Sequence, residues 1–106
     1  MGYLYIMTNT RNTVLYVGVT TDLYRRMMEH SEGIGSRFTH KYNCKKLVYY
    51  EVFQTIEEAL SRETQLKWWR RIWKIQLIEK SNPTWADLGE NLFSCPYLRD
   101  SGSSPE

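Results

Sequence analysis

The sequence has few of the features that assign a chain to a specialised class. No apolar run in the 106 residues approaches the length of roughly 18 to 20 residues that is needed to span a bilayer, so we expect no membrane segment. Only Cys44 and Cys95 could form a disulfide, and their spacing suits no zinc motif. The N-terminus lacks the basic and then apolar layout of a signal peptide. These absences favour a reduced, cytoplasmic protein.

The length allows one domain and leaves no room for a second hydrophobic core. No internal repeat is visible. Four Trp and eight Tyr supply much of the area that a core would bury. The last six residues, Ser-Gly-Ser-Ser-Pro-Glu, cannot bury enough surface to become ordered. We therefore expect a folded domain over residues 1–91 and a partly disordered tail over 92–106.

The net charge of +2 hides an uneven distribution. Residues 1–80 carry thirteen Lys and Arg against eight Asp and Glu, a net +5, whereas residues 81–106 carry one Arg against four Asp and Glu, a net −3. The predicted domain is therefore modestly basic. A basic surface is what binding to phosphates requires, and it supports a nucleic-acid partner without establishing one.

The N-terminal third predicts a β-hairpin followed by a helix. Aromatic and aliphatic residues alternate over residues 3–7, as in a strand with one buried face, and residues 14–19 form the returning strand. The turn formers 8–13 join the two strands. Thr20, Thr21 and Asp22 then offer N-cap oxygens. In the helix that follows we expect one apolar face, formed by Leu23, Met27 and Met28, and a polar face opposite to it.

The remainder predicts one strand and two helices. Residues 47–53 are rich in β-branched and aromatic side chains, and Thr55 with Glu58 forms a capping box. Helical character continues to residue 80, and we expect a break at residues 68–71, because one helix of about 37 Å is long for so small a domain. Asn82-Pro83 ends the second helix. The fold class is α+β: a three-stranded antiparallel sheet flanked by helices in the order ββ-α-β-αα.

Two short motifs on the predicted strands carry a resemblance to a known family. Residues 3–5 read Tyr-Leu-Tyr and residues 16–18 read Tyr-Val-Gly, Arg26 follows Tyr16 by ten residues, and His30 lies one helical turn later. This pattern resembles the catalytic domain of the GIY-YIG endonucleases. The departures are Tyr3 in place of the first glycine, and other aliphatic residues in place of the isoleucines. The resemblance extends to about residue 91.

The resemblance implies a hydrolytic site with a divalent metal ion. By analogy with the family, Tyr16 is the general base, Glu63 holds Mg²⁺ or Mn²⁺, and a late asparagine belongs to the site. Asn82 and Asn91 both fit that position, and Asn82 is favoured because Asn-Pro closes the last helix. One carboxylate suffices for an ion whose other ligands are water and phosphate oxygens.

The other site residues follow from their chemistry. Arg26 has the fork geometry that fits two phosphate oxygens, so we expect it to stabilise the transition state. Tyr5 and His30 would orient water and phosphate, and Gly18 would let the backbone approach the phosphate. Each residue also has a structural alternative: a tyrosine can belong to the core, a histidine can favour the helix dipole, and Glu63 can pair with a lysine one turn later.

A second set of side chains is predicted to bind DNA. Aromatic residues are interleaved with the cations that follow the first helix. This pattern suits a loop whose cations contact phosphates while its aromatic rings stack on bases. It equally suits a solvated loop whose aromatic residues dock on the core. The arginines beside Trp68 and Trp69 could likewise flank stacked bases, although packing of these tryptophans is the favoured reading. The predicted DNA-binding residues are Arg25, Arg37, Lys41, Lys45, Lys46, Arg70 and Arg71.

Three functions remain open at this level. The first is a metal-dependent DNA endonuclease of low sequence specificity that prefers branched or single-stranded DNA, acts in repair or recombination, and is targeted by a protein partner. The second is a non-catalytic nucleic-acid-binding module that keeps the fold. The third is a small protein-interaction domain working through its tryptophans. Metal-dependent nicking of DNA separates the first from the other two.

Overall fold

The computed structural model describes residues 1–31 and 44–89, except for the side chains of His30 and Ser31. Within these residues, three strands and three helices follow one another in the predicted order ββ-α-β-αα, which confirms the α+β class. Their bounds are β1 Gly2–Thr8, β2 Leu15–Thr20, α1 Leu23–Ser31, β3 Lys46–Phe53, α3 Ile56–Lys67 and α4 Arg71–Ser81.

The sheet has the order β2-β1-β3, with both pairs antiparallel. The first strand is therefore the central one. Its residues from Leu4 to Thr8 are all buried, since helices cover both faces and a partner strand lies on each side. In the registers, Tyr5 lies opposite Gly18 of β2 and opposite Tyr50 of β3.

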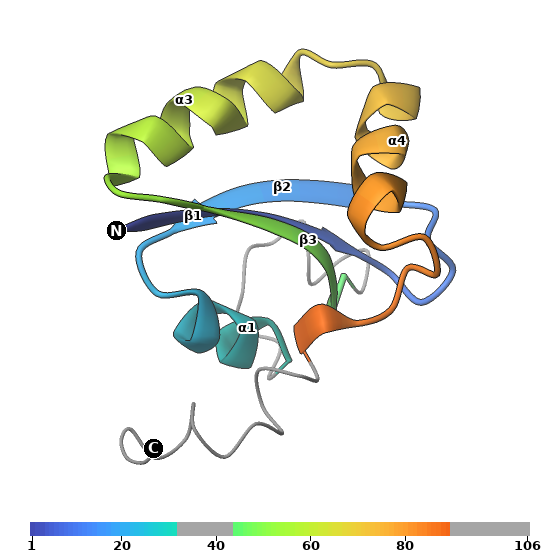
Figure 1. Cartoon of the computed structure of the whole chain (residues 1–106). Coiled ribbons are helices and arrows are strands. Elements are labelled where there is room, and N and C mark those ends of the chain that lie inside the picture. Colours follow the sequence, from blue (N-terminus) through green and yellow to red (C-terminus); the bar gives the residue numbers. More distant parts are fainter. Residues whose placement is uncertain (32–43, 90–106) are drawn as a thin grey trace.

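Each face of the sheet has its own core (Figure 1). On one face, Leu4 and Ile6 pack against α3 and α4 through Leu66 and Ile78. On the other face, alternate residues of β1 pack against α1 in a cluster of Tyr5, Met7, Leu23, Met27 and Leu47. The prediction for α1 was wrong at one position: Met28 is 41 % exposed, whereas Leu23 and Met27 are buried against the sheet.

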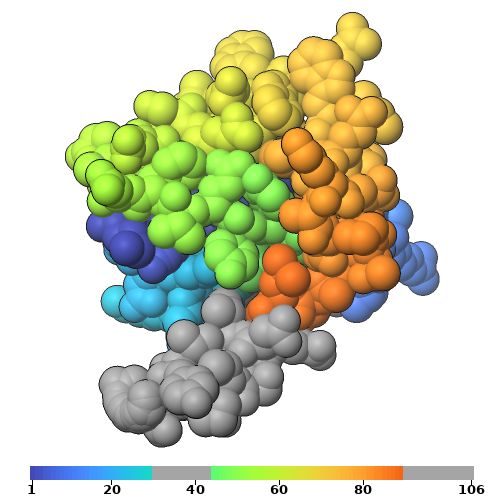
Figure 2. Space-filling model, viewed as in Figure 1, coloured from blue at the N-terminus to red at the C-terminus, as the bar shows by residue number. Residues whose placement is uncertain are grey.

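The expected break between the last two helices is confirmed. α3 ends at Lys67 and α4 begins at Arg71, and the corner between them projects from the molecule at the top of Figure 2. The predicted capping box is also present. The Thr55 side chain accepts a hydrogen bond from the Glu58 amide, and the Glu58 carboxylate accepts one from the Thr55 amide. This box starts α3 directly after β3 and so fixes its direction across the sheet.

Some predictions lie outside the described residues. These are most of the predicted DNA-binding segment after the first helix, with Arg37 and Lys41, and also Asn91 and the tail 92–106. Within residues 1–31 and 44–89, no helix is both long and apolar enough to cross a membrane.

Candidate active site

Tyr5 and Gly18 interlock across neighbouring strands. They are direct partners in the antiparallel register, so both face the α1 side of the sheet. A Cβ atom built on Gly18 would lie 2.5 Å from both Cζ and the hydroxyl oxygen of Tyr5. The space that a side chain at position 18 would need is thus filled by the end of the Tyr5 ring. Sequence reasoning had assigned that space to a phosphate.

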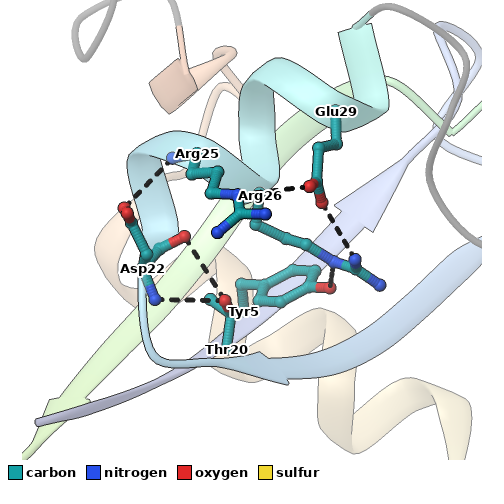
Figure 3. Close-up of polar contacts among 6 residues, drawn as sticks. All are labelled: Tyr5, Thr20, Asp22, Arg25, Arg26 and Glu29. Atoms are coloured by element: carbon teal, nitrogen blue, oxygen red, sulfur yellow. Dashed lines mark hydrogen bonds and ion pairs between the residues drawn. The ribbon is translucent and has the colours of Figure 1, made fainter.

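The hydroxyl of Tyr5 in turn fixes an arginine of α1 (Figure 3). Arg26 Nε donates a hydrogen bond to the Tyr5 hydroxyl over 3.2 Å, and Arg26 Nη1 lies 3.1 Å from Glu29 Oε1. The guanidinium is therefore held from two directions, by the central strand and by its own helix. A planar group held in this way is oriented before a ligand arrives.

The start of α1 is fixed by the predicted capping residues. Asp22 Oδ1 accepts a hydrogen bond from the Arg25 amide at 3.1 Å, and Thr20 Oγ1 accepts one from the Asp22 amide at the same distance. The helix consequently begins within three residues of the end of β2. This short connection brings Arg26 back over the strand pair that holds Tyr5 and Gly18.

A polar cleft of about 210 Å³ opens beside Arg26 at the start of α1. Arg25 lies on its rim, exposed over 77 % of its side chain and 3.5 Å from Glu29. Glu29, which pairs with both arginines, was not among the predicted site residues, although its spacing of three and four residues from them is the helical signal for such pairs. The cleft is lined by Thr20, Thr21, Asp22, Arg25, Arg26 and Glu29.

The electrostatics of the site give Tyr5 and Arg26 different tasks. Burial raises the pKa of the Tyr5 hydroxyl above its ordinary value of 10.0, Arg26 acts in the opposite direction, and Tyr16 and Glu63 raise it further. Tyr5 is thus a neutral hydroxyl at physiological pH. The hydrogen bond to Tyr5 raises the pKa of Arg26, which stays charged. Since Tyr5 has no exposed surface, it suits the positioning of Arg26 better than contact with a substrate.

Tyr16 and Glu63 complete the group of predicted residues near Tyr5. The rings of Tyr16 and Tyr5 have centroids 6.3 Å apart at an angle of 46°, and Tyr16 is only half-buried. Glu63 comes from α3 and influences the pKa of Tyr5, so its carboxylate lies within electrostatic range of the site. The structure thus brings together Tyr5, Tyr16, Gly18 and Arg26, and Glu63 lies within electrostatic range of Tyr5. His30 belongs to α1, and its side chain is not described.

Comparison with known proteins agrees with this geometry. Residues 1–76 match the GIY-YIG catalytic domain. The chain belongs to the GIY-YIG family. A UPF0213 protein of Haloquadratum walsbyi is 41 % identical over 78 residues, which are 74 % of this chain and 86 % of the relative. A UPF0213 protein of Clostridium perfringens is 38 % identical over 82 residues, covering 77 % and 87 %.

A solved structure supports the same assignment. The solution structure of a UPF0213 protein from Bacillus halodurans matches with a TM-score of 0.53 and 30 % identity, covering 85 % of this chain and 96 % of the other. The family is one of nucleases, so membership implies binding of nucleic acid. GIY-YIG nucleases are generally dependent on a divalent metal ion.

The donor set of this GIY-YIG domain fits an ion that is shared with the substrate. Among the described residues, no three His, Cys, Asp or Glu side chains gather into a metal-binding cluster. Glu63 offers one hard carboxylate whose side chain is 20 % exposed, and its Oε2 lies 3.4 Å from Lys67 Nζ. Mg²⁺ accepts one or two carboxylates and fills its shell with water and phosphate oxygens. Glu63 would hold such an ion, with Lys67 as a local competitor for the carboxylate.

Asn82 has a structural task in this domain. It is buried, and its Nδ2 donates to the carbonyls of Val48 and Ala86 at 3.0 Å each, while its Oδ1 accepts from the Ala86 amide at 3.1 Å. Both ends of the amide are therefore engaged by backbone. The side chain ties the turn after α4 to β3, and these contacts account for an asparagine here without a catalytic role.

The predicted DNA-binding cations lie in several places. Arg25 borders the cleft, Lys45 is exposed, and Lys46 is half-buried at the start of β3. Arg70 lies over the Trp73 ring at 6.0 Å, and Arg71 Nη2 donates to the Thr13 carbonyl at 2.8 Å. Among the described members of this set, Arg25 is the one that lines the cleft together with Arg26.

The tryptophans of the corner between α3 and α4 divide into two kinds. Trp69 packs against the core beneath Arg62 and meets Trp73 edge to face. Trp68, in contrast, is 84 % exposed, and Trp73 is 47 % exposed beside a groove of about 390 Å³. The predicted packing of these tryptophans is thus confirmed for Trp69 and wrong for Trp68.

Proposed function

We propose that this GIY-YIG domain is a metal-dependent endonuclease that hydrolyses phosphodiester bonds in DNA. The contact between Arg26 and the buried Tyr5 hydroxyl carries the proposal, because it orients a permanent positive charge toward the polar cleft. A solvated arginine would not need such a fixed position. A reacting phosphate, which gains negative charge in the transition state, does require one.

In the proposed reaction, water attacks phosphorus, a new P–O bond forms, and the bond to the leaving oxygen breaks. Tyr16, half-buried and beside Tyr5, first gives its phenol proton to the solvent, and the resulting phenolate oxygen takes the proton from the attacking water. Arg26 binds the non-bridging oxygens, and Tyr5 positions Arg26. An ion bound by Glu63 would supply Lewis-acid stabilisation of the phosphate and of the leaving oxygen. The leaving oxygen takes up a proton from the surrounding water, which balances the reaction.

Specificity is proposed to be low. Phosphate contacts position a nucleic acid but carry no sequence information, and the cations named above suit phosphates. We therefore propose a preference for branched or single-stranded DNA, a role in repair or recombination, and targeting by a protein partner. Cys44 is a free and buried thiol, which supports a reducing, cytoplasmic setting.

Cleavage of labelled single-stranded, duplex and branched DNA in Mg²⁺, Mn²⁺ or chelator tests the proposal. The wild type should cleave at least one substrate, and only with a metal ion. Glu63→Gln should lose cleavage yet bind DNA in chelator like the wild type. Tyr16→Phe should keep its fold and lose about a hundredfold or more in rate, as general bases typically contribute.

The alternatives give different results in the same assay. A chain that binds DNA in chelator and never cuts it is the non-catalytic module. If the chain neither binds nor cuts DNA, the remaining hypothesis is a protein-interaction domain that works through its tryptophans. Full cleavage by Glu63→Gln in Mg²⁺ would remove Glu63 from the metal site.

A further inference from the structure

The corner between α3 and α4 presents an aromatic side chain that the site at Tyr5 does not use. Trp68 is 84 % exposed, although its backbone is ordered: its amide donates to the Gln65 carbonyl at 3.2 Å, and the next amide, of Trp69, donates to the Leu66 carbonyl at 3.1 Å. The ring is thus held out into solvent by a fixed chain. An exposed aromatic ring at a projecting corner has a ring face open for stacking (Figure 2).

Three cations accompany this tryptophan along the chain. Lys67 precedes it, Arg71 begins α4, and Lys74 lies one turn further along the same face. Arg71 is anchored to the turn of the β1–β2 hairpin by its 2.8 Å hydrogen bond to the Thr13 carbonyl. Burial lowers the pKa of Lys74, and the charges of Arg71 and Lys67 lower it further, so both of these cations repel Lys74. An anion bound between them would relieve that repulsion.

We propose that Lys67, Trp68, Arg71 and Lys74 form a subsite for one unpaired nucleotide of a single-stranded nucleic acid, which rests on the nuclease function proposed above. The base stacks on the Trp68 ring, and the adjoining phosphate lies among the cations. Stacking of this kind needs an open base face, whereas in a duplex both faces are covered by neighbouring bases. Aromatic residues beside a positive groove are the usual means of holding single strands.

The subsite lies close to the candidate metal ligand. Trp68 follows Glu63 by five residues, which is about 7.5 Å along a helix axis. Lys67 joins the two places directly, because its ammonium is 3.4 Å from the Glu63 carboxylate. We therefore propose that a strand held at the corner continues along α3 toward Glu63.

A pair of substitutions at Trp68 tests the stacking. The full chain is titrated, in chelator, into a fluorescein-labelled twelve-nucleotide oligo-dT and into a labelled duplex of the same length. Trp68→Leu should raise the Kd for the single strand by about fivefold, which is the lower end of the range for the loss of one stacked base. The Kd for the duplex should change less than twofold. Trp68→Phe keeps a ring face and should bind like the wild type. Equal thermal stability of both variants controls for folding.

A second pair of substitutions tests the phosphate contact. Lys74→Gln should reduce the slope of log Kd against log salt by about 0.7 for the single strand, the value for one neutralised phosphate. Lys80→Gln removes the same charge from the exposed other end of the same helix and should leave the slope unchanged.

The outcomes separate the subsite from the nuclease function. The subsite would be overturned if Trp68→Leu left the Kd unchanged, or if it weakened the binding of single strand and duplex equally. Either result would count even if the wild type cleaves DNA with metal. Displacement of the oligonucleotide by polyglutamate as efficiently as by unlabelled oligo-dT would reassign the corner to an acidic protein partner. A wild type that binds and cleaves no nucleic acid would overturn both proposals at once.

Discussion

The Tyr5 site and the α3–α4 corner are each built around an aromatic ring and an arginine, yet they differ in burial. Tyr5 has no exposed surface and Arg26 is held on two sides, whereas Trp68 is 84 % exposed and two of the cations near it repel the third. Burial fixes a charge in one orientation, which a reaction requires. Exposure leaves a ring face and a cluster of charges open, which suits the holding of a substrate.

Arginine-to-lysine exchange should separate the two regions most strongly. Arg26→Lys keeps a positive charge but loses the fork that Tyr5 and Glu29 orient, so we expect cleavage to fall by about 10²–10³ with little change in binding. Arg71→Lys at the corner should change the cleavage rate less than twofold. Single-turnover rates beside anisotropy titrations measure both, and equal losses in rate would contradict the division between the regions.

Gly18→Ala tests how tightly the buried site is packed. Its Cβ would lie 2.5 Å from the Tyr5 hydroxyl and Cζ, so Tyr5 must move and its bond to Arg26 must lengthen. We expect a loss of about 2–3 kcal/mol in the free energy of unfolding together with a loss of cleavage. Adding Tyr5→Leu should recover stability but not cleavage, as measured by urea denaturation and single-turnover assays. If Gly18→Ala alone cleaves normally, the interlock does not matter for the reaction.

Asn82→Ala should affect stability without affecting the reaction. The substitution leaves the carbonyls of Val48 and Ala86 without their donor, at a cost of about 2 kcal/mol. Because Asn82 joins α4 to β3 by these contacts, the cleavage rate of the folded protein should remain unchanged. A rate that falls at temperatures where circular dichroism shows a folded chain would return Asn82 to the catalytic group.

The smallest expected effect is a dependence of stability on alkaline pH. The pKa of Tyr5 is raised in the folded protein. Its contribution to the free energy of unfolding is therefore complete below pH 10 and declines as the pH rises from 10 toward the pKa in the folded state. The unfolding free energy of the wild type should therefore fall more steeply above pH 10 than that of Tyr5→Phe. The difference in slope is at most about 1.4 kcal/mol per pH unit. Parallel slopes in urea denaturation at pH 9 to 11 would show that Tyr5 is not desolvated.

Local patterns predicted most of the elements in this fold. Alternation marked the strands, the Thr55 capping box marked the start of α3, and the excessive length of one helix predicted the break that ends α3 at Lys67. The order β2-β1-β3 was not predictable, since the third strand could have joined either edge of the hairpin. Motif spacing likewise identified Tyr5, Gly18 and Arg26 as a group.

The roles inside that group depend on distances that a sequence does not contain. Gly18 makes room for Tyr5 because the register places them opposite each other. The partner of Asn82, the Val48 carbonyl, lies 34 residues away in the chain. The exposure of Trp68 depends on how the break between α3 and α4 turns, and a Trp-Trp pair alone favours burial.

The central place of β1 has a consequence for synthesis of the chain. Tyr5, Gly18 and Arg26 all lie within the first 26 residues, yet an isolated two-stranded hairpin is marginally stable in water. The second edge of β1 is covered only by β3, which ends at Phe53. At about 5–20 residues per second, a ribosome needs a few seconds to add that segment. During this interval the nascent hairpin carries the complete motif with an open strand edge, and the geometry of its site must await the third strand.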